Sequence, residues 1–392
     1  MNKQGIETKI WNKRFIIILL VNTAIFLSFN MATAGFPAFV SSKANSHVTT
    51  GLVTTLSALG ALLMRPIAGY ILDRRLARLF SLFGLLLMAA PLICLLSSDT
   101  ATVLTVRFLQ GAGWGLASTA CSKAIANALP HERLSEGIGY AGFLSSAATA
   151  FAPGIALSIG EKSGFDVMLG IIGISAVAAA ILYLLSRQSG AERAASAEKK
   201  CASFIPILKE TYLPALLIMV VTVAYAPMVT FIKPYAASLG VGSTAAYFFA
   251  YACATVIVRP LTGLYVDRKN ADLPAITALA SIATASVLLS VCHSLPELLM
   301  AAVLSGIGTG AGMNALQTMS VKRTAASNRG MAMAIFLFGF DLGMGVGSFI
   351  AGLISNYTGF PILFLIMSVP PTVACMVYTI ALIRNNSTHS RS

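Results

Sequence analysis

Charged residues are scarce in this chain of 392 residues: they make up 10%, against roughly 25% in an ordinary soluble domain. Acids are the scarcest, with 14 Asp and Glu against 27 Lys and Arg. No pair among the six cysteines has metal-ligand spacing, and all four histidines fall in predicted loops or the C-terminal tail. We therefore expect no metal, no disulfide framework, no cofactor and no enzymatic activity, because no cluster of reactive side chains is present to support one.

Apolar residues are abundant instead, at 57%, and they gather in runs near the ~20 residues that cross a bilayer as a helix. Helices are expected because lipid cannot satisfy open backbone groups. The first run is too long for the core of a cleaved secretory signal, so we expect it to be retained. The sequence thus predicts an all-α polytopic membrane protein with twelve spans, at 15–40, 50–72, 79–97, 101–128, 137–160, 167–186, 212–238, 244–266, 273–292, 297–321, 330–355 and 361–384.

The basic residues between these spans predict the orientation of the chain. Predicted segments on the side of the N-terminus carry twenty Lys and Arg, whereas those on the other side carry only Lys43 and Lys162. Because basic loops remain in the cytoplasm, we expect a multi-pass protein of the cell membrane with both termini cytoplasmic. The net charge of +13 then faces the lipid bilayer, and no nucleic-acid partner is needed to explain it.

One ten-residue stretch occurs twice. Residues 65–74 recur as residues 259–268, 194 positions later, with Arg, Pro, Gly, Asp and Arg at the same spacing. A shared offset of about half the chain indicates two homologous halves. We predict a six-helix bundle at 1–186, a polar cytoplasmic linker at 187–210, and a second bundle with a short cytoplasmic tail at 211–392.

Two six-span halves, with a Gly-x-x-x-Asp-Arg box after spans two and eight, resemble the major facilitator superfamily. The resemblance implies that fold and twelve transmembrane helices in two pseudo-symmetric bundles. It also implies a conformational latch, in which Asp73 faces the start of span eleven and Asp267 the start of span five, where a helix N-terminus attracts a carboxylate. The implied latch residues are Arg65, Gly69, Asp73, Arg74, Arg259, Gly263, Asp267 and Arg268.

Two shorter boxes resemble the drug:proton antiporter branch of that superfamily. Arg107, Gln110, Gly111 and Gly113 match the pattern R-x-x-Q-G-x-G, whose arginine is implicated in proton transfer. Residues 152–156 form a degenerate antiporter box, with Ala at two of its glycines. The resemblance therefore implies a secondary active transporter that exports small molecules by alternating access, in antiport with protons.

Charges present in only one half are the better candidates for transport chemistry, because residues kept in both halves serve the common scaffold. Arg107 has Ala302 as its counterpart, and Asp341 has Ser146. Asp341 is the only acid predicted deep within a span, about 16 Å from the cytoplasmic end of span eleven. An ionisable group near the middle of the membrane requires an ion-pair partner, a water-filled cavity or a functional role. Asp341 could load and release a proton, or it could simply form an ion pair with Arg65, and these readings are compatible.

The remaining candidates follow from the spans that line the cavity in this superfamily, and each could equally serve packing. The proton-coupling candidates are Asp341, Arg107 and Glu136; the substrate-cavity candidates are Asn30, Gln110, Trp114, Tyr225, Lys233, Asn314 and Gln317. We expect a monomer whose partners are a small-molecule substrate, protons and lipid. The interior holds more bases than acids, which also favours an alternative: a carrier for an anionic or zwitterionic metabolite, such as a carboxylate, an amino-acid derivative or a metal-chelating opine, in either direction.

Overall fold

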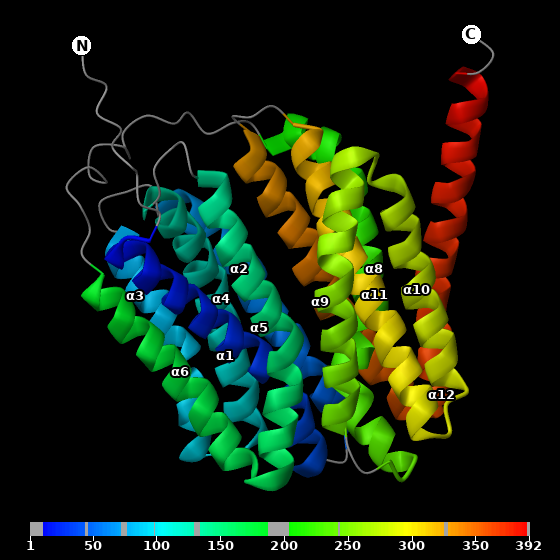
Figure 1. Ribbon diagram of the computed structural model, residues 1–392. Helices are drawn as coiled ribbons and strands as arrows, with labels where there is room; N and C mark the ends of the chain where they lie inside the picture. The colour runs from blue at the N-terminus through cyan, green and yellow to red at the C-terminus, as the bar shows by residue number, and fades with distance from the viewer. Residues whose placement is uncertain are drawn as a thin grey trace, which may run out of the picture.

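The computed structural model describes residues 11–43, 46–71, 77–97, 99–128, 134–186, 204–241, 244–324 and 328–389. Within these ranges the chain is helical apart from short turns, and no strand occurs. Figure 1 shows the helices standing side by side in two groups, the first half of the chain in blue to green and the second in green to red. The prediction of an all-α fold is confirmed.

Six helices form the first bundle, and the third of them changes form at its end. Ala90 begins a 3₁₀ turn with Pro91 at its second position, since a proline lacks the N–H that would continue the α-helix. The elements are α1 (Lys13–Lys43), α2 (His47–Ile71), α3 (Ala77–Met88) with η1 (Ala90–Leu95), α4 (Thr100–Ala128), α5 (Leu134–Lys162) and α6 (Phe165–Leu185).

The second bundle repeats this plan. Its elements are α8 (Phe204–Ser238), α9 (Thr244–Arg268), α10 (Asp272–Ser290), α11 (Leu295–Lys322) and α12 (Arg329–His389). α12 contains two helices, because Gly359 has φ 79° and ψ 175°, a conformation that favours glycine, and Pro361 follows it. With η1 counted together with α3 and the two helices of α12 counted separately, the described residues form twelve helical segments, which overlap the twelve predicted spans. α8 begins at Phe204, inside the segment predicted as linker.

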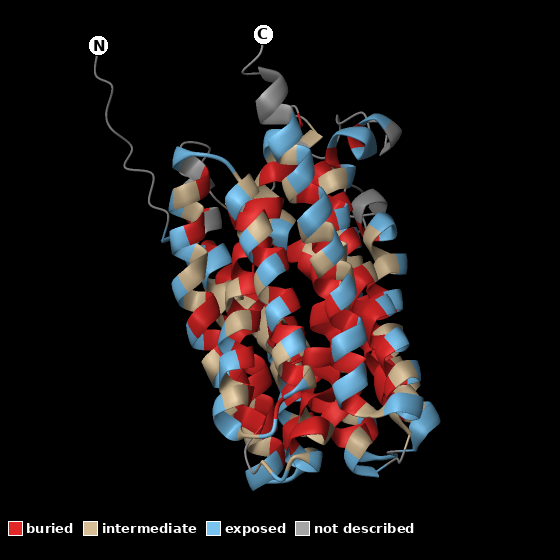
Figure 2. Ribbon diagram, turned by 90° about the vertical axis from the view of Figure 1, so that its right-hand side faces the viewer, coloured by how far each residue is buried: buried red, intermediate tan, exposed pale blue. Residues whose placement is uncertain are grey.

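The outer surface of the bundle is apolar. Ten of the helices in the described ranges are long and apolar enough to cross a membrane. Large side chains such as Phe143, Leu261 and Ile383 are more than half exposed on the outside, while Figure 2 shows the buried residues gathered between the helices. This arrangement suits a multi-pass membrane protein, whose outer side chains face lipid rather than water.

Small residues allow the helices of each half to approach closely. A Cβ on Gly111 of α4 would clash with the carbonyl of Ser57 in α2, and a Cβ on Gly306 of α11 would stand 2.5 Å from the carbonyl oxygen of Tyr251 in α9. Gly111 and Gly306 occupy equivalent positions of the repeat, 195 residues apart. The same tight contact is thus built twice, as expected for glycines that serve membrane-helix packing.

The halves meet through the pairs α2–α12, α5–α9 and α1–α8. We call the end where α1 begins and α12 finishes the basic end, and the end where α1 finishes and α2 begins the opposite end. Near the opposite end, a Cβ on Gly154 of α5 would lie 3.3 Å from Cβ of Phe248 in α9, whereas toward the basic end a Cβ on Gly142 or Gly263 of the same helices would meet nothing within 4 Å. The α5–α9 contact is therefore tight near the opposite end and open toward the basic end.

Candidate functional site

An ion pair joins the two halves near the middle of the bundle. Nε of Arg65, on α2, donates a hydrogen bond to Oδ2 of Asp341, on α12, at 2.6 Å. Both side chains are mostly buried, 11% and 8% exposed. Asp341 is the only acid among the buried side chains of the described residues. The ion pair suggested by the sequence is thus present. Protonation of Asp341 would neutralise its carboxylate and so weaken this link between the halves.

Arg107 is fully buried inside the first half. Its Nε donates to the carbonyl of Val53 at 3.3 Å, one terminal nitrogen donates to Oε1 of Gln110 at 2.5 Å, and the guanidinium lies 5.2 Å from the ring centre of Phe36. The described residues give it no carboxylate partner. Nε2 of Gln110 is also buried without a hydrogen-bond partner. α4 thus carries a desolvated positive charge held by a carbonyl, an amide and an aromatic ring.

A second polar cluster lies inside the second half, around Tyr225 of α8. Its ring stacks on that of Tyr251 of α9 at 5.6 Å, and the hydroxyl of Tyr251 accepts a hydrogen bond from Thr309 at 3.0 Å. Arg259 is close enough to both tyrosines to interact with them electrostatically. Asn314 donates to the backbone carbonyl of Arg259 at 2.7 Å. The structure therefore brings Tyr225, Asn314 and Arg259 together.

The other cavity candidates have partners within their own surroundings. Asn30 donates to the carbonyl of Phe26 at 2.8 Å, and Trp114 stacks on Phe29 at 4.3 Å. Gln317 reaches Sδ of Met333 at 3.2 Å. Lys233 lies at the opposite end, 3.6 Å from Glu161 across the two halves and 4.7 Å from the ring centre of Phe165.

Half of the predicted latch lies outside what the structure describes, namely Asp73 and Arg74, the surroundings of Gly69 and the side chain of Asp267. The side chain of Glu136, a proton-coupling candidate, also lies outside it. Arg268 is exposed at the end of α9. Of the latch candidates, Arg65 and Arg259 are the ones whose surroundings can be compared.

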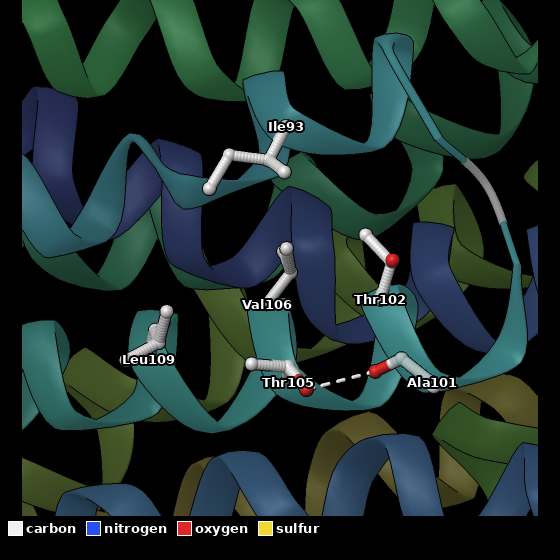
Figure 3. A pocket seen from close by; sticks show the side chains of 6 residues that line it. All are labelled: Ile93, Ala101, Thr102, Thr105, Val106 and Leu109. Carbon is white, nitrogen blue, oxygen red and sulfur yellow. Dashed lines mark hydrogen bonds between the residues drawn. The ribbon is translucent and has the colours of Figure 1, made fainter.

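Two surface hollows are each lined by residues of a single half. The larger, about 300 Å³, is lined by Ile93, Ala101, Thr102, Thr105, Val106 and Leu109 (Figure 3). Its Thr105 hydroxyl already donates to the carbonyl of Ala101 at 2.8 Å. The other, about 210 Å³, lies on α9, α10 and α11 around Tyr265 and Thr277. Such shallow, largely apolar hollows suit lipid chains better than a polar substrate.

Tyr251 is a member of the second cluster that the sequence analysis passed over. A signal was available: at the repeat offset of 194 its counterpart is Ser57. Tyr251 is thus a large polar aromatic present in one half only, by the same reasoning that singled out Arg107. His47 was also passed over; it stacks on Phe360 at 4.9 Å across the halves, a contact between distant segments that no local pattern indicates.

Two repeated helix bundles that meet along a central boundary are the architecture of many secondary transporters. The family model described as "Major Facilitator Superfamily" matches residues 18–291 and 273–392 of the chain. The chain belongs to this superfamily, and it is therefore a transporter rather than an enzyme.

Relatives and solved structures agree with that assignment. The chain is 24% identical over 371 residues to the uncharacterized MFS-type transporter YhhS of Escherichia coli (strain K12), covering 90% of this chain and 89% of the relative. It is 23% identical over 339 residues to the staphylopine export protein of Staphylococcus aureus (strain Mu50 / ATCC 700699), covering 82% and 84%.

Among solved structures, the fold is similar to the nucleoside transporter NupG, with a TM-score of 0.74, 12% identity, and 94% and 99% of the two chains covered. It is equally similar, at a TM-score of 0.74 and 16% identity, to a bacterial homolog of the human lysosomal transporter Spinster in an inward-facing, unoccupied conformation, with 94% and 96% covered. At such identities these likenesses show the fold, a major facilitator fold of two six-helix bundles.

Proposed function

We propose that the chain exports a small molecule from the cytoplasm in exchange for protons, with Asp341 as the proton-carrying group. The observation that carries the proposal is the Arg65–Asp341 pair, because it places the only buried acid of the described residues across the boundary between the halves. The excess of Lys and Arg on the side of the termini supports a cell-membrane orientation with both termini inside.

Protonation of Asp341 would break the pair in a defined way. The neutral acid no longer attracts Arg65, so α2 and α12 lose a link and the halves can separate at that level. Losing one partner of a buried pair costs about 3–5 kcal/mol, and the residual exposure of both side chains places this pair at the lower end. A proton that crosses 100 mV supplies roughly 2.3 kcal/mol. The two energies are similar, so one proton could reset the pair in each cycle.

Arg107 would assist this exchange from within the first half. Its charge is desolvated and without a carboxylate among the described residues, so it repels further positive charge in the pathway and favours an anion there. In the antiporter-like box it stands three residues before Gln110, to which it donates. We assign it a supporting role in coupling.

The bases inside the bundle favour a second candidate for the cargo, an anionic or zwitterionic metabolite. Within the described ranges, the buried Arg107 and the partly exposed Arg259 have no acid partner, and Asp341 is the only buried acid. A lipophilic cation would meet repulsion at such a site. The similarity to a staphylopine export protein adds support to an export direction.

Transport by the purified chain in proteoliposomes tests the proposal. Ethidium stands for the organic cations and citrate for the polycarboxylates, each measured with and without an imposed pH gradient. Accumulation of either probe that rises with the gradient and vanishes with a protonophore supports proton-coupled transport, and the probe that moves identifies the charge class. Equal movement of both probes in protein-free vesicles, or no effect of the gradient on a transported probe, would contradict the proposal.

A further inference from the structure

We propose that Arg259 is the site at which the transporter binds a carboxylate group of its substrate, in the open space between α9 and α5. This inference rests on the proposed function and specifies the class of substrate for it. It comes from a comparison of Arg259 with Arg65, the residue at the equivalent position of the repeat.

The two arginines occupy equivalent places but have different partners. Arg65 of α2 pairs with Asp341 of α12 at 2.6 Å. Exchange of the halves turns the α2–α12 contact into the α9–α5 contact, and both contacts are present. The residue of α5 equivalent to Asp341, 195 positions earlier, is Ser146. At this repeat-equivalent contact α9 carries the second arginine, and α5 carries a hydroxyl at the position where α12 carries the carboxylate.

Ser146 does not replace the missing acid. Its hydroxyl donates to the carbonyl of Gly142, on its own helix, at 2.7 Å. The Nε of Arg259 is buried and has no hydrogen-bond partner among the described residues, although the residue as a whole is partly exposed. A buried, unpaired donor of a charged group is costly, so an anion that reaches it gains a strong, charge-assisted hydrogen bond.

Space for such an anion exists one helical turn away on each helix. A Cβ on Gly263, four residues after Arg259, would meet nothing within 4 Å, and the same is true of Gly142, four residues before Ser146. At four-residue spacing these glycines share a helix face with the residues in question. Most other helical glycines are in close contact with a neighbouring helix, and Gly170 of α6 is the other exception among the described helices. Gly142 and Gly263 differ from Gly170 in lying on two helices that contact each other, so we take this pair as an opening beside Arg259.

The surrounding side chains suit an organic carboxylate. Tyr225 and Tyr251 stack on each other within electrostatic range of Arg259, and they present phenolic groups as well as flat apolar faces. Asn314 holds the backbone carbonyl of Arg259 at 2.7 Å and thereby fixes the helix there. Since the group missing from the repeat is itself a carboxylate, we infer a carboxylate ligand rather than a phosphate, on a molecule with an apolar or zwitterionic remainder.

Equilibrium binding to the purified full chain tests this site without any transport. The melting temperature is measured against rising concentrations of iminodiacetate, citrate, inorganic phosphate and succinamide, at constant ionic strength. Wild type should gain stability with iminodiacetate or citrate, and not with the uncharged succinamide. Arg259→Gln should weaken the apparent affinity by about tenfold or more, Arg259→Lys should restore part of it, and Lys269→Gln, exposed just beyond the same helix, should behave as wild type.

Ser146→Asp provides the sharpest variant, because it supplies the acid that the repeat lacks. It should pair with Arg259, raise the melting temperature without ligand and remove the response to carboxylates, while Ser146→Asn leaves that response in place. The proposal is overturned if wild type does not respond to either carboxylate, if phosphate alone stabilises it, or if Arg259→Gln responds as wild type does. None of these results depends on proton coupling, which the transport assay tests separately.

Discussion

Arg65 and Asp341 are joined directly, Nε to Oδ2 at 2.6 Å, although 276 residues separate them in the chain. Their counterparts in the repeat are Arg259, which has no acid partner among the described residues, and Ser146, whose hydroxyl is bonded to its own helix. The two halves thus share a scaffold, but the α2–α12 contact holds an ion pair and the equivalent α9–α5 contact does not. We suggest that the α2–α12 contact carries the proton and that the α9–α5 contact binds the substrate.

The Arg65–Asp341 pair should stabilise the observed conformation as a unit. Arg65→Gln or Asp341→Asn leaves one buried charge unpaired, and each should lower stability by about 3 kcal/mol. The double variant removes both charges and should lie closer to wild type than either single variant. The measurement is a double-mutant cycle of melting temperatures in detergent. Additive losses in the cycle would show that the two side chains are not coupled.

Arg107 should matter for transport more than for folding. A desolvated charge without an acid opposes stability, so Arg107→Met, of similar length, should leave the free energy of unfolding unchanged or raise it by about 1–3 kcal/mol, yet abolish gradient-driven transport. Arg107→Lys keeps the charge but loses the planar contacts to Val53 and Phe36, and should retain partial activity. A large loss of stability in Arg107→Met would instead make the residue a structural anchor.

Close helix approach in the first half should depend on Gly111. Gly111→Ala places a Cβ against the carbonyl of Ser57, so α2 and α4 must move apart, at a cost of about 1–3 kcal/mol. Gly170→Ala is the matched control, because a Cβ there meets nothing within 4 Å and alanine favours the helix by about 1 kcal/mol. Melting temperatures should therefore fall in the first variant and hold or rise in the second. Equal effects would remove the packing argument.

Lys233 and Glu161 link the halves at the opposite end, but their separation is 3.6 Å and both are partly exposed. Such a pair contributes about 1 kcal/mol or less. Lys233→Gln should therefore change the melting temperature little, while a cysteine placed at Thr54, which is buried against Thr230 of the other half, becomes more reactive because the opposite end opens more often. Unchanged reactivity would show that the pair does not hold this end closed. The same variant tests whether Lys233 contacts substrate, because a contact would make the melting temperature of Lys233→Gln respond less to citrate than that of wild type.

The fold could be predicted from the sequence because its causes are local or repeated. Twelve apolar runs give twelve helical spans, and the double occurrence of the 65–74 pattern gives the two halves. The exact ends were less predictable. α8 starts at Phe204, eight residues before the predicted span, since the polar start of a helix is invisible to hydropathy. The break at Gly359 depends on a backbone angle that composition does not reveal.

The candidate site was predictable only in part. Asp341 and Arg65 could be paired because the fold makes their helices neighbours and both lie at similar depth. The repeat also pointed to Arg107 as a charge without a counterpart. Arg259 was expected to act as scaffold because it recurs, whereas its surroundings leave Nε without a partner. The repeat shows that an arginine occurs at both positions, but it does not show which side chains surround each one. The different partners of Arg65 and Arg259 could therefore be recognised only in the three-dimensional structure.

A control variant can distinguish an acid that binds and releases a proton during transport from one that stays ionised. Asp99 is a suitable control for Asp341, because hydrogen bonds from Ser97 and Thr102 hold the pKa of its exposed carboxyl well below the usual range. Asp99 therefore stays ionised across the pH range of a transport assay. Asp99→Asn should leave the pH dependence of transport as it is in wild type.

The most direct test of the account compares two assays on Asp341→Asn in proteoliposomes, with the probe that wild type transports. Gradient-driven accumulation requires a proton to bind and leave, whereas counterflow exchange of labelled for unlabelled probe requires only substrate binding and movement of the halves. We predict that Asp341→Asn loses accumulation under a pH gradient while it retains counterflow, and that Asp99→Asn keeps both. Accumulation by Asp341→Asn at the wild-type level would contradict the central claim that Asp341 carries the proton.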